Sequence, residues 1–190
     1  MTMSYGSLTL VCGPMYAGKT TEMLKRVLWA RNGQGLHVRV FKPAFDNRYS
    51  ETEIVSHDGL RTTAENLTTL PPLDDMQGVD LVVLDEVQFM MEPYVSGDTV
   101  SWVRGCLGRG IDVVAGGLDL DINGVPFAIT ASLAAMADEI IKARANCTVC
   151  GRPASKTHRS TTGHHAADGP HIELGATDKY EARCNQHWRM

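Results

Sequence analysis

The chain has 190 residues, enough for one well-buried domain with a small appendage. Apolar residues make up 43% and charged residues 21% of the chain, which excludes a disordered or a fibrous protein, and no apolar run approaches the roughly 18 residues that span a bilayer. The formal charge is −4, yet residues 142–190 hold eight Lys and Arg against four Asp and Glu, scattered without a run, which favours a face toward solvent or an anionic substrate over a nucleic-acid patch.

Strands alternate with helices in chain order. Apolar runs predict buried strands at Ser7–Cys12, His37–Lys42, Leu81–Leu84, Ile111–Ala115 and Glu139–Ala145. Apolar residues at helical spacing predict helices at Lys19–Arg31, Val100–Gly108 and Ile129–Met136. Ala44–Asp58 is polar, and we expect an irregular excursion there with a short strand near Ile54. This alternation predicts an α/β fold, a parallel sheet covered by helices on both faces.

A phosphate-binding loop follows the first predicted strand. The stretch GPMYAGKT satisfies G-x-x-x-x-G-K-[ST], in which glycines let main-chain N–H groups approach phosphate, the lysine neutralises charge and the hydroxyl binds Mg²⁺. The predicted nucleotide-binding residues are Gly13, Pro14, Met15, Tyr16, Ala17, Gly18, Lys19 and Thr20. With a strand before it and a helix after it, the motif predicts a sheet of the P-loop NTPase type.

Two acids end the strand Leu81–Leu84. Asp85 is the candidate that holds Mg²⁺ through water while Thr20 binds it directly. Glu86 can orient a hydrolytic water or accept the proton of a substrate hydroxyl. The pair therefore leaves open whether the chain is an ATPase or a kinase.

Three of the five cysteines fall in a metal-binding pattern. Cys147-x-x-Cys150 and Cys184-x-x-His187 are spaced for one tetrahedral Zn²⁺, although His158, His164, His165 and His171 compete for the fourth position. A shell of four protein ligands leaves no catalytic water, so we expect a structural zinc that ties the base of a loop over Gly151–Arg183. Cys12 and Cys106 fall in apolar patterns and are expected in the core. Because the composition changes near Lys142, we expect a nucleotide-binding domain over residues 1–142 and a zinc domain over 143–190.

Several motifs together resemble the type II, or cellular-type, thymidine kinase family. They are GPMYAGKT, KPAFDNRY, SHDG, DEVQF, GGLDLDINGVPF, the C-x-x-C knuckle, Thr157-His158-Arg159, ELGATDKY and the closing knuckle. The resemblance covers essentially the whole chain. It implies a P-loop sheet with a small C-terminal lasso domain, and transfer of the γ-phosphate of ATP to the 5′-hydroxyl of thymidine or deoxyuridine.

The resemblance also implies roles for single residues. Glu86 would be the catalytic base, with Asp46 and Arg48 near the transferring phosphoryl group and Gln88 at the nucleotide site. The base of the nucleoside would be held largely by main-chain bonds of a lasso segment. The substrate-binding residues would be Met15, Phe89, Leu118, Phe127, His171, Ile172, Glu173, Leu174, Gly175 and Tyr180.

The chain departs from the family pattern at three places. Ile122 stands where the family usually has an aromatic residue, so one contact to the base is expected to be lost. Ala176 replaces the second of two glycines, and alanine tolerates positive φ poorly. His187 replaces a fourth cysteine, a mild change because both residues bind zinc.

The expected cofactors are Mg·ATP and a structural Zn²⁺. The family implies a homotetramer that deoxythymidine triphosphate inhibits, with no nucleic-acid or membrane partner. An odd number of cysteines without a secretory signal favours a reducing cytoplasm. Two alternatives remain: a zinc-ribbon P-loop ATPase acting on nucleic acid, in which Glu86 activates water, and a zinc-stabilised nucleotide sensor that does not need Glu86.

Overall fold

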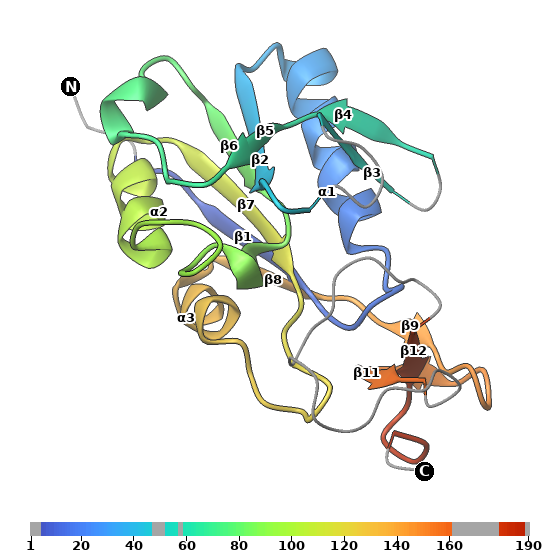
Figure 1. Cartoon of the computed structure of the whole chain (residues 1–190). Helices are drawn as coiled ribbons and strands as arrows, with labels where there is room; N and C mark the ends of the chain where they lie inside the picture. The colour runs from blue at the N-terminus through green and yellow to red at the C-terminus, as the bar shows by residue number, and fades with distance from the viewer. Residues whose placement is uncertain (1–4, 47–51, 57–58, 161–178, 189–190) are drawn as a thin grey trace.

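A six-stranded parallel sheet forms the centre of the computed structural model, which describes residues 5–46, 52–56, 59–160 and 179–188 (Figure 1). The strand order is β5-β2-β6-β7-β1-β8. The strands are β1 (Leu8–Cys12), β2 (Val38–Pro43), β5 (Glu65–Leu67), β6 (Leu81–Leu84), β7 (Asp112–Gly117) and β8 (Glu139–Lys142). All neighbours pair in parallel, which confirms the predicted α/β fold.

Helices cover both faces of this sheet, as predicted. The helix α1 (Lys19–Leu28) packs on one face, and α2 (Thr99–Gly108) and α3 (Ala128–Met136) pack on the other. Alternation along β1 explains why both faces are apolar, because Leu10 points to the α2 and α3 side and Val11 to the α1 side. Within the part of the chain that the structure describes, no helix is long and apolar enough to cross a membrane.

The sequence missed the strand β5 at the edge of the sheet. Glu65, Asn66 and Leu67 include one apolar residue, so they form no apolar run, yet they pair in parallel with β2. The predicted helix over Lys19–Arg31 is also modified, since α1 ends at Leu28 and continues as a π-helical segment, η1 (Trp29–Gly33). Two 3-10 turns, η2 (Leu73–Met76) and η3 (Val87–Phe89), were not predicted.

Three small antiparallel sheets lie outside the main one. The short strand expected near Ile54 is β3 (Glu53–Val55), which pairs with the unpredicted β4 (Arg61–Thr63). The tail contains β9 (Ala145–Asn146) with β10 (Pro153–Ala154), and β11 (Lys156–Arg159) with β12 (Tyr180–Arg183). The prediction of a plain loop over Gly151–Arg183 is therefore wrong at its described ends, because main-chain pairing orders segments that are poor in apolar residues.

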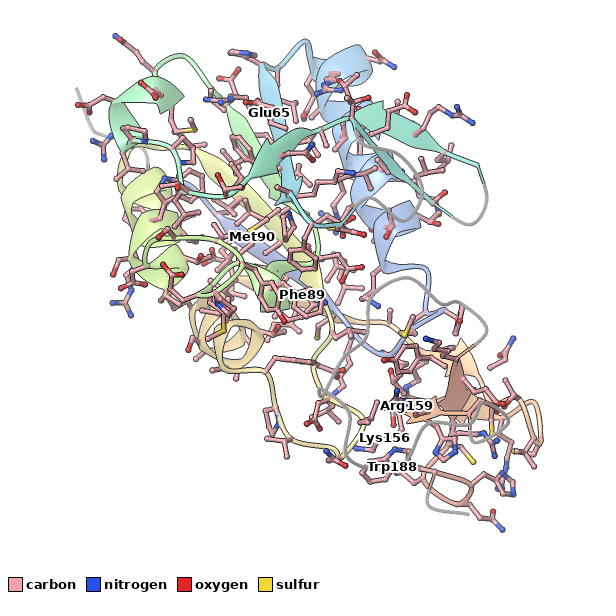
Figure 2. The ribbon with its side chains drawn as sticks, viewed as in Figure 1. Glu65, Phe89, Met90, Lys156, Arg159 and Trp188 are labelled. Carbon is pink, nitrogen blue, oxygen red and sulfur yellow. The ribbon has the colours of Figure 1, made fainter. Side chains whose placement is uncertain are left out.

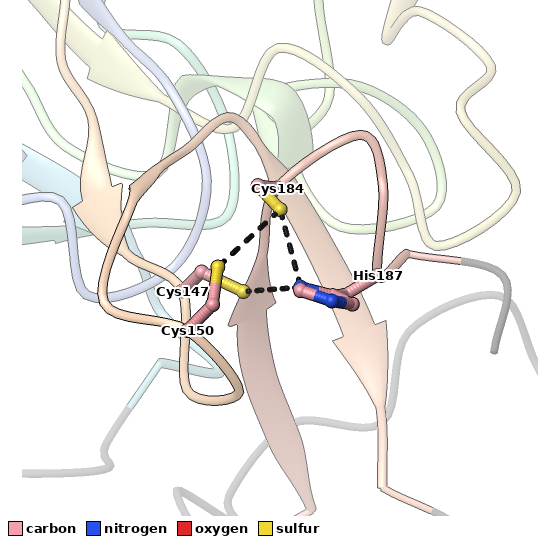
Figure 3. A group of neighbouring side chains, drawn as sticks. All are labelled: Cys147, Cys150, Cys184 and His187. Carbon is pink, nitrogen blue, oxygen red and sulfur yellow. Dashed lines mark hydrogen bonds between the residues drawn. The ribbon is translucent and has the colours of Figure 1, made fainter.

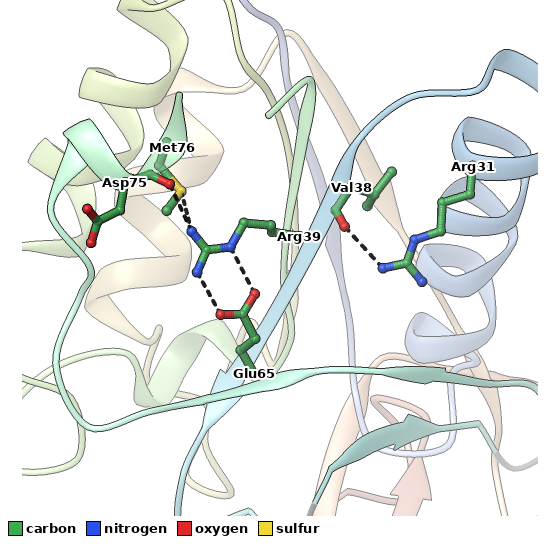
Figure 4. Close-up of polar contacts among 6 residues, drawn as sticks. All are labelled: Arg31, Val38, Arg39, Glu65, Asp75 and Met76. Atoms are coloured by element: carbon green, nitrogen blue, oxygen red, sulfur yellow. Dashed lines mark hydrogen bonds and ion pairs between the residues drawn. The ribbon is translucent and has the colours of Figure 1, made fainter. Parts of the chain in front are cut away.

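An arginine fork holds β5 against β2 (Figure 4). The Arg39 guanidinium donates two hydrogen bonds to the Glu65 carboxylate, at 2.8 and 2.6 Å, and a third to the carbonyl oxygen of Asp75 at 3.1 Å. Its hydrogen bonds to Glu65 hold the pKa of that carboxyl below its usual value. The ion pair thus stabilises a three-residue edge strand that makes few apolar contacts.

This pair makes stability depend on pH in a defined window. Since the pKa of Glu65 is lower in the folded chain, its contribution is present above pH about 4.5 and is lost as the pH falls through the folded pKa. Glu65→Gln should lower the melting temperature by about 1–4 °C at pH 7 and by progressively less as the pH falls below about 4.5, as followed by circular dichroism. Asp74→Asn, at a 95% exposed partner of Arg109, is the matched control with a smaller effect. A loss that does not shrink as the pH falls would contradict the assignment.

Candidate functional site

The candidate residues gather at the carboxyl edge of the main sheet. The phosphate loop follows β1, Asp85 and Glu86 follow β6, Asp46 follows β2, and Leu118 follows β7. Because parallel strands all end at the same edge, these loops share one side of the molecule. The edge therefore brings the phosphate loop and the acid pair to one site.

The phosphate loop needs glycine at both ends. Gly13 has φ 144°, and a Cβ there would lie 2.4 Å from the carbonyl oxygen of Ala143. Gly18 has φ 73° and precedes α1, whose N-terminus has no side-chain cap, so the loop leads into the positive end of the helix dipole, where an anion is stabilised. The Lys19 ammonium donates to the carbonyl oxygen of Pro14 at 2.7 Å. The loop thus has the shape and donors of a phosphate cradle.

The acid pair is held tightly at the end of β6. Asp85 is 7% exposed, and its Oδ1 accepts the N–H of Glu86 at 3.0 Å. Glu86 has φ 51°, a left-handed conformation that costs free energy for a residue other than glycine and that is enriched at functional sites. Its carboxylate accepts a hydrogen bond from the side-chain amide of Gln88.

Gln88 links the acid pair to the neighbouring strand end. Its Oε1 accepts the N–H of Leu118 at 2.9 Å while its nitrogen donates to Glu86, and the side chain is buried. The amide therefore orients the Glu86 carboxylate relative to Leu118. The family resemblance placed Gln88 only at the nucleotide site and did not predict this role.

An aromatic cluster adjoins the acid pair. Two predicted substrate residues, Phe89 and Phe127, meet edge to face with ring centroids 6.4 Å apart. Phe45 and Tyr94 extend the cluster, with Phe45 lying 5.3 Å from Phe89 and 4.5 Å from Tyr94. Figure 2 shows Phe89 and Met90 near the centre of the molecule. Neither Phe45 nor Tyr94 was predicted, because isolated aromatics on separate loops give no spacing signal.

The tail contacts the phosphate loop directly. The N–H of Met15 donates to Oγ1 of the buried Thr157 in β11 at 3.1 Å, and Ala17 packs on the small core of Ala145, Cys147, Ala154, Ala182 and Cys184. Trp188 donates to the carbonyl oxygen of Thr157 at 3.2 Å. Tyr180, a predicted substrate residue, is buried on the neighbouring β12. Sequence analysis noted the motif at Thr157 but not this contact.

Four predicted ligands meet in one cluster (Figure 3). The ligand atoms of Cys147, Cys150, Cys184 and His187 all lie within 4.8 Å of one another. Sγ of Cys150 and Cys184 are 3.9 Å apart, and Nδ1 of His187 is 3.4 and 3.6 Å from two of the sulfurs. Zn–S bonds of about 2.3 Å place tetrahedral sulfurs roughly 3.8 Å apart, so the donor set fits Zn²⁺. Among the described histidines, His158 is not in the group.

The pKa of the cluster residue Cys147 is lowered, whereas the pKa values of the two core cysteines are raised. Burial alone would raise the pKa of Cys147, but main-chain N–H groups of Cys184, Val149 and Cys150, with His187, lower it to about 5, which favours the thiolate that zinc needs. Burial raises the pKa of Cys106 to about 12, and burial with the Asp119 carboxylate raises that of Cys12. Both of these thiols are core residues, as predicted.

Part of the predicted site lies outside the described residues. These positions are Arg48, His171, Ile172, Glu173, Leu174 and Gly175, together with the competing histidines His164 and His165. Their roles stay predictions.

Comparison with known proteins covers nearly the whole chain. The family described as thymidine kinase matches residues 6–188. A curated thymidine kinase from Thermococcus kodakarensis is 40% identical, over 96% of this chain and 93% of its own length. The matched range includes every candidate residue described above.

Loss of the metal cluster should reach the phosphate loop. Cys184→Ser removes a sulfur that contacts both Cys150 and His187, so bound zinc should fall from about one per chain to near zero by atomic emission. Met15 bonds to Thr157 and Ala17 packs on the core of this tail, so both contacts should weaken when zinc is lost. The affinity of the variant for an ATP analogue should therefore fall by about tenfold or more, measured by calorimetry. Cys106→Ala, at a buried cysteine of α2, should keep its zinc. Unchanged nucleotide affinity in the zinc-free variant would refute the coupling.

Proposed function

We propose that this chain, which belongs to the thymidine kinase family and is a nucleoside kinase, transfers the γ-phosphate of ATP to the 5′-hydroxyl of thymidine and of deoxyuridine. One observation carries the proposal. A phosphate cradle after β1 and an oriented acid pair after β6 share one sheet edge with an aromatic cluster, in a chain that matches the family over residues 6–188. That edge therefore combines a place for a triphosphate, a carboxylate that can accept a proton, and an apolar wall for a planar ring.

The phosphate loop would bind ATP. Main-chain N–H groups of residues 16–20 would hold the phosphates, and the Lys19 ammonium would move from Pro14 to the β- and γ-phosphates. Thr20 and Asp85 offer the hydroxyl and carboxylate oxygens that Mg²⁺ prefers. The bound ion would neutralise charge on the transferring group.

Glu86 would accept the proton of the 5′-hydroxyl. The hydrogen bond from Gln88 keeps its carboxylate in one orientation. Asp46 and Arg48 would lie near the transferring phosphoryl group, where a guanidinium stabilises charge on the equatorial oxygens.

The aromatic cluster supports a site for the pyrimidine ring. Phe89 and Phe127, with Leu118 and Met15, would form its apolar wall, and Tyr180 with residues 171–175 would close the other side. Ile122 offers no ring to the base, so this wall depends on the two phenylalanines.

Further features follow from the family resemblance. We propose that residues 1–142 bind nucleotide and that residues 143–190 form the zinc domain, since the main sheet ends at Lys142 and β9 pairs elsewhere. We also propose a cytoplasmic homotetramer that deoxythymidine triphosphate inhibits. A nucleic-acid ATPase is disfavoured because Tyr180 is buried and Trp188 is engaged with Lys156 and Thr157.

Product analysis tests the proposed reaction. Purified protein with Mg·ATP should release ADP only when thymidine or deoxyuridine is added, and should form one nucleoside monophosphate per ADP by chromatography. ADP release that ignores nucleosides and rises with single-stranded DNA would reject the kinase in favour of the ATPase.

Substitution of the catalytic base tests its role. Glu86→Gln should lower kcat by about 10²-fold or more, because proton transfer by a positioned base contributes about 10²–10⁴-fold. Affinity for an ATP analogue should stay within about threefold, because the phosphate loop is untouched. Glu92→Gln, an exposed acid on the same segment, is the control that should keep its rate. A near-normal kcat in Glu86→Gln would assign proton acceptance elsewhere.

A further inference from the structure

Lys42 is a buried lysine that the proposed mechanism does not use. Lys42 is 3% exposed, although lysine is almost never fully buried unless its ammonium is paired or hydrogen-bonded. The ammonium donates to the carbonyl oxygen of Asp46 at 2.9 Å and to that of Glu53 at 3.2 Å. A charge desolvated to this extent indicates that its hydrogen bonds fix a specific arrangement of the chain around it.

The position of Lys42 is next to the acid pair. In the parallel pairing of β2 with β6, Phe41 lies opposite Leu84, and the N–H of Asp85 donates to the carbonyl oxygen of Phe41 at 2.9 Å. Alternation along β2 directs Lys42 to the same face as Val38 and Val40, which is the face that α1 covers. The ammonium therefore lies on the phosphate-loop side of the sheet, one strand away from Asp85.

Two acceptors of Lys42 lie on separate elements, since Asp46 follows β2 and Glu53 begins β3. The ammonium therefore links the end of β2 to the start of β3. Asp46 is further fixed by its N–H, which donates to the carbonyl oxygen of Pro43 at 3.0 Å, and it is 8% exposed. Without the ammonium, the carbonyl oxygens of the buried Asp46 and the half-buried Glu53 would lose a charged donor.

The aromatic cluster fixes the residue before Asp46. Phe45 packs on Phe89 and Tyr94, which follow Glu86 in the chain. Asp46 thus adjoins a ring that contacts the segment after Glu86, and its own carbonyl oxygen accepts from Lys42 on β2. The two contacts restrict where Asp46 stands relative to Glu86.

We propose that Lys42 is a positioning residue for phosphoryl transfer, whose buried ammonium holds the Asp46 backbone against the start of β3 in the arrangement that the reaction needs. The proposal rests on the proposed function in taking Asp46 to act on the transferring group. Preorganised charges and fixed geometry lower the barrier because they need not rearrange during transfer. Lys42 therefore acts through Asp46 and is not itself assigned a contact with substrate.

Lys42→Met tests this role, because methionine fills similar space without charge or donors. We expect kcat for thymidine to fall by about 10–100-fold, while affinity for an ATP analogue stays within about threefold. Amide hydrogen exchange measured by mass spectrometry should quicken in peptides that cover residues 44–53 and not in those from α1 or the zinc domain. Lys25→Met, at an exposed lysine of α1, is the matched control and should leave all three readouts unchanged.

A conservative variant separates positioning from general stability. Lys42→Arg keeps a cation with donors, so it should recover a substantial part of the lost kcat and slow the exchange of residues 44–53 again. The proposal is wrong if Lys42→Met keeps kcat within twofold, if arginine is no better than methionine, or if neither variant folds. If the wild-type protein forms no nucleoside monophosphate, the proposed function is rejected. The hydrogen-exchange result would still test whether Lys42 slows exchange in residues 44–53.

Discussion

The parallel pairing of β1, β7 and β6 is the constraint on which the rest of the site depends. Leu10 lies opposite Ala115, and Ala115 opposite Leu84, so the phosphate loop and the acid pair leave the sheet in fixed register with one strand between them. At about 4.8 Å per strand, their starting points are roughly 10 Å apart. This separation leaves room for phosphates between a cradle on one side and carboxylates on the other.

The tail supports the phosphate loop as well as extending the chain. Gly13 passes the carbonyl oxygen of Ala143 with no space for a Cβ, and Met15 donates to Thr157 on β11. The core of this tail consists of small residues, alanines and cysteines, which bury too little apolar surface to fold unaided. A tetrahedral zinc would supply the missing free energy, so metal binding and the shape of the nucleotide site are physically linked.

The other side of the site is built from buried polar links. Gln88 joins Glu86 to Leu118, and Lys42 joins Asp46 to Glu53, each with its polar atoms satisfied within a buried setting. Buried polar groups hold one geometry because any other would leave a donor or acceptor unpaired. The Glu86 carboxylate and the Asp46 backbone are therefore held by residues whose own positions are set by the sheet edge.

The sequence by itself predicted the sheet class, the phosphate-loop motif, the acid pair after β6 and the two pairs Cys147–Cys150 and Cys184–His187, while leaving other histidines open as the fourth ligand. Each motif or pair consists of residues close together in the chain, where spacing and periodicity report geometry directly. The tertiary structure alone decided the edge strand β5, the aromatic cluster around Phe45, the hold of Lys42 on Asp46 and the bond from Met15 to Thr157. That bond joins residues 142 positions apart. Contacts made by folding distant segments together leave no local pattern, since the energy that selects them depends on burial and on partners that exist only in the folded chain.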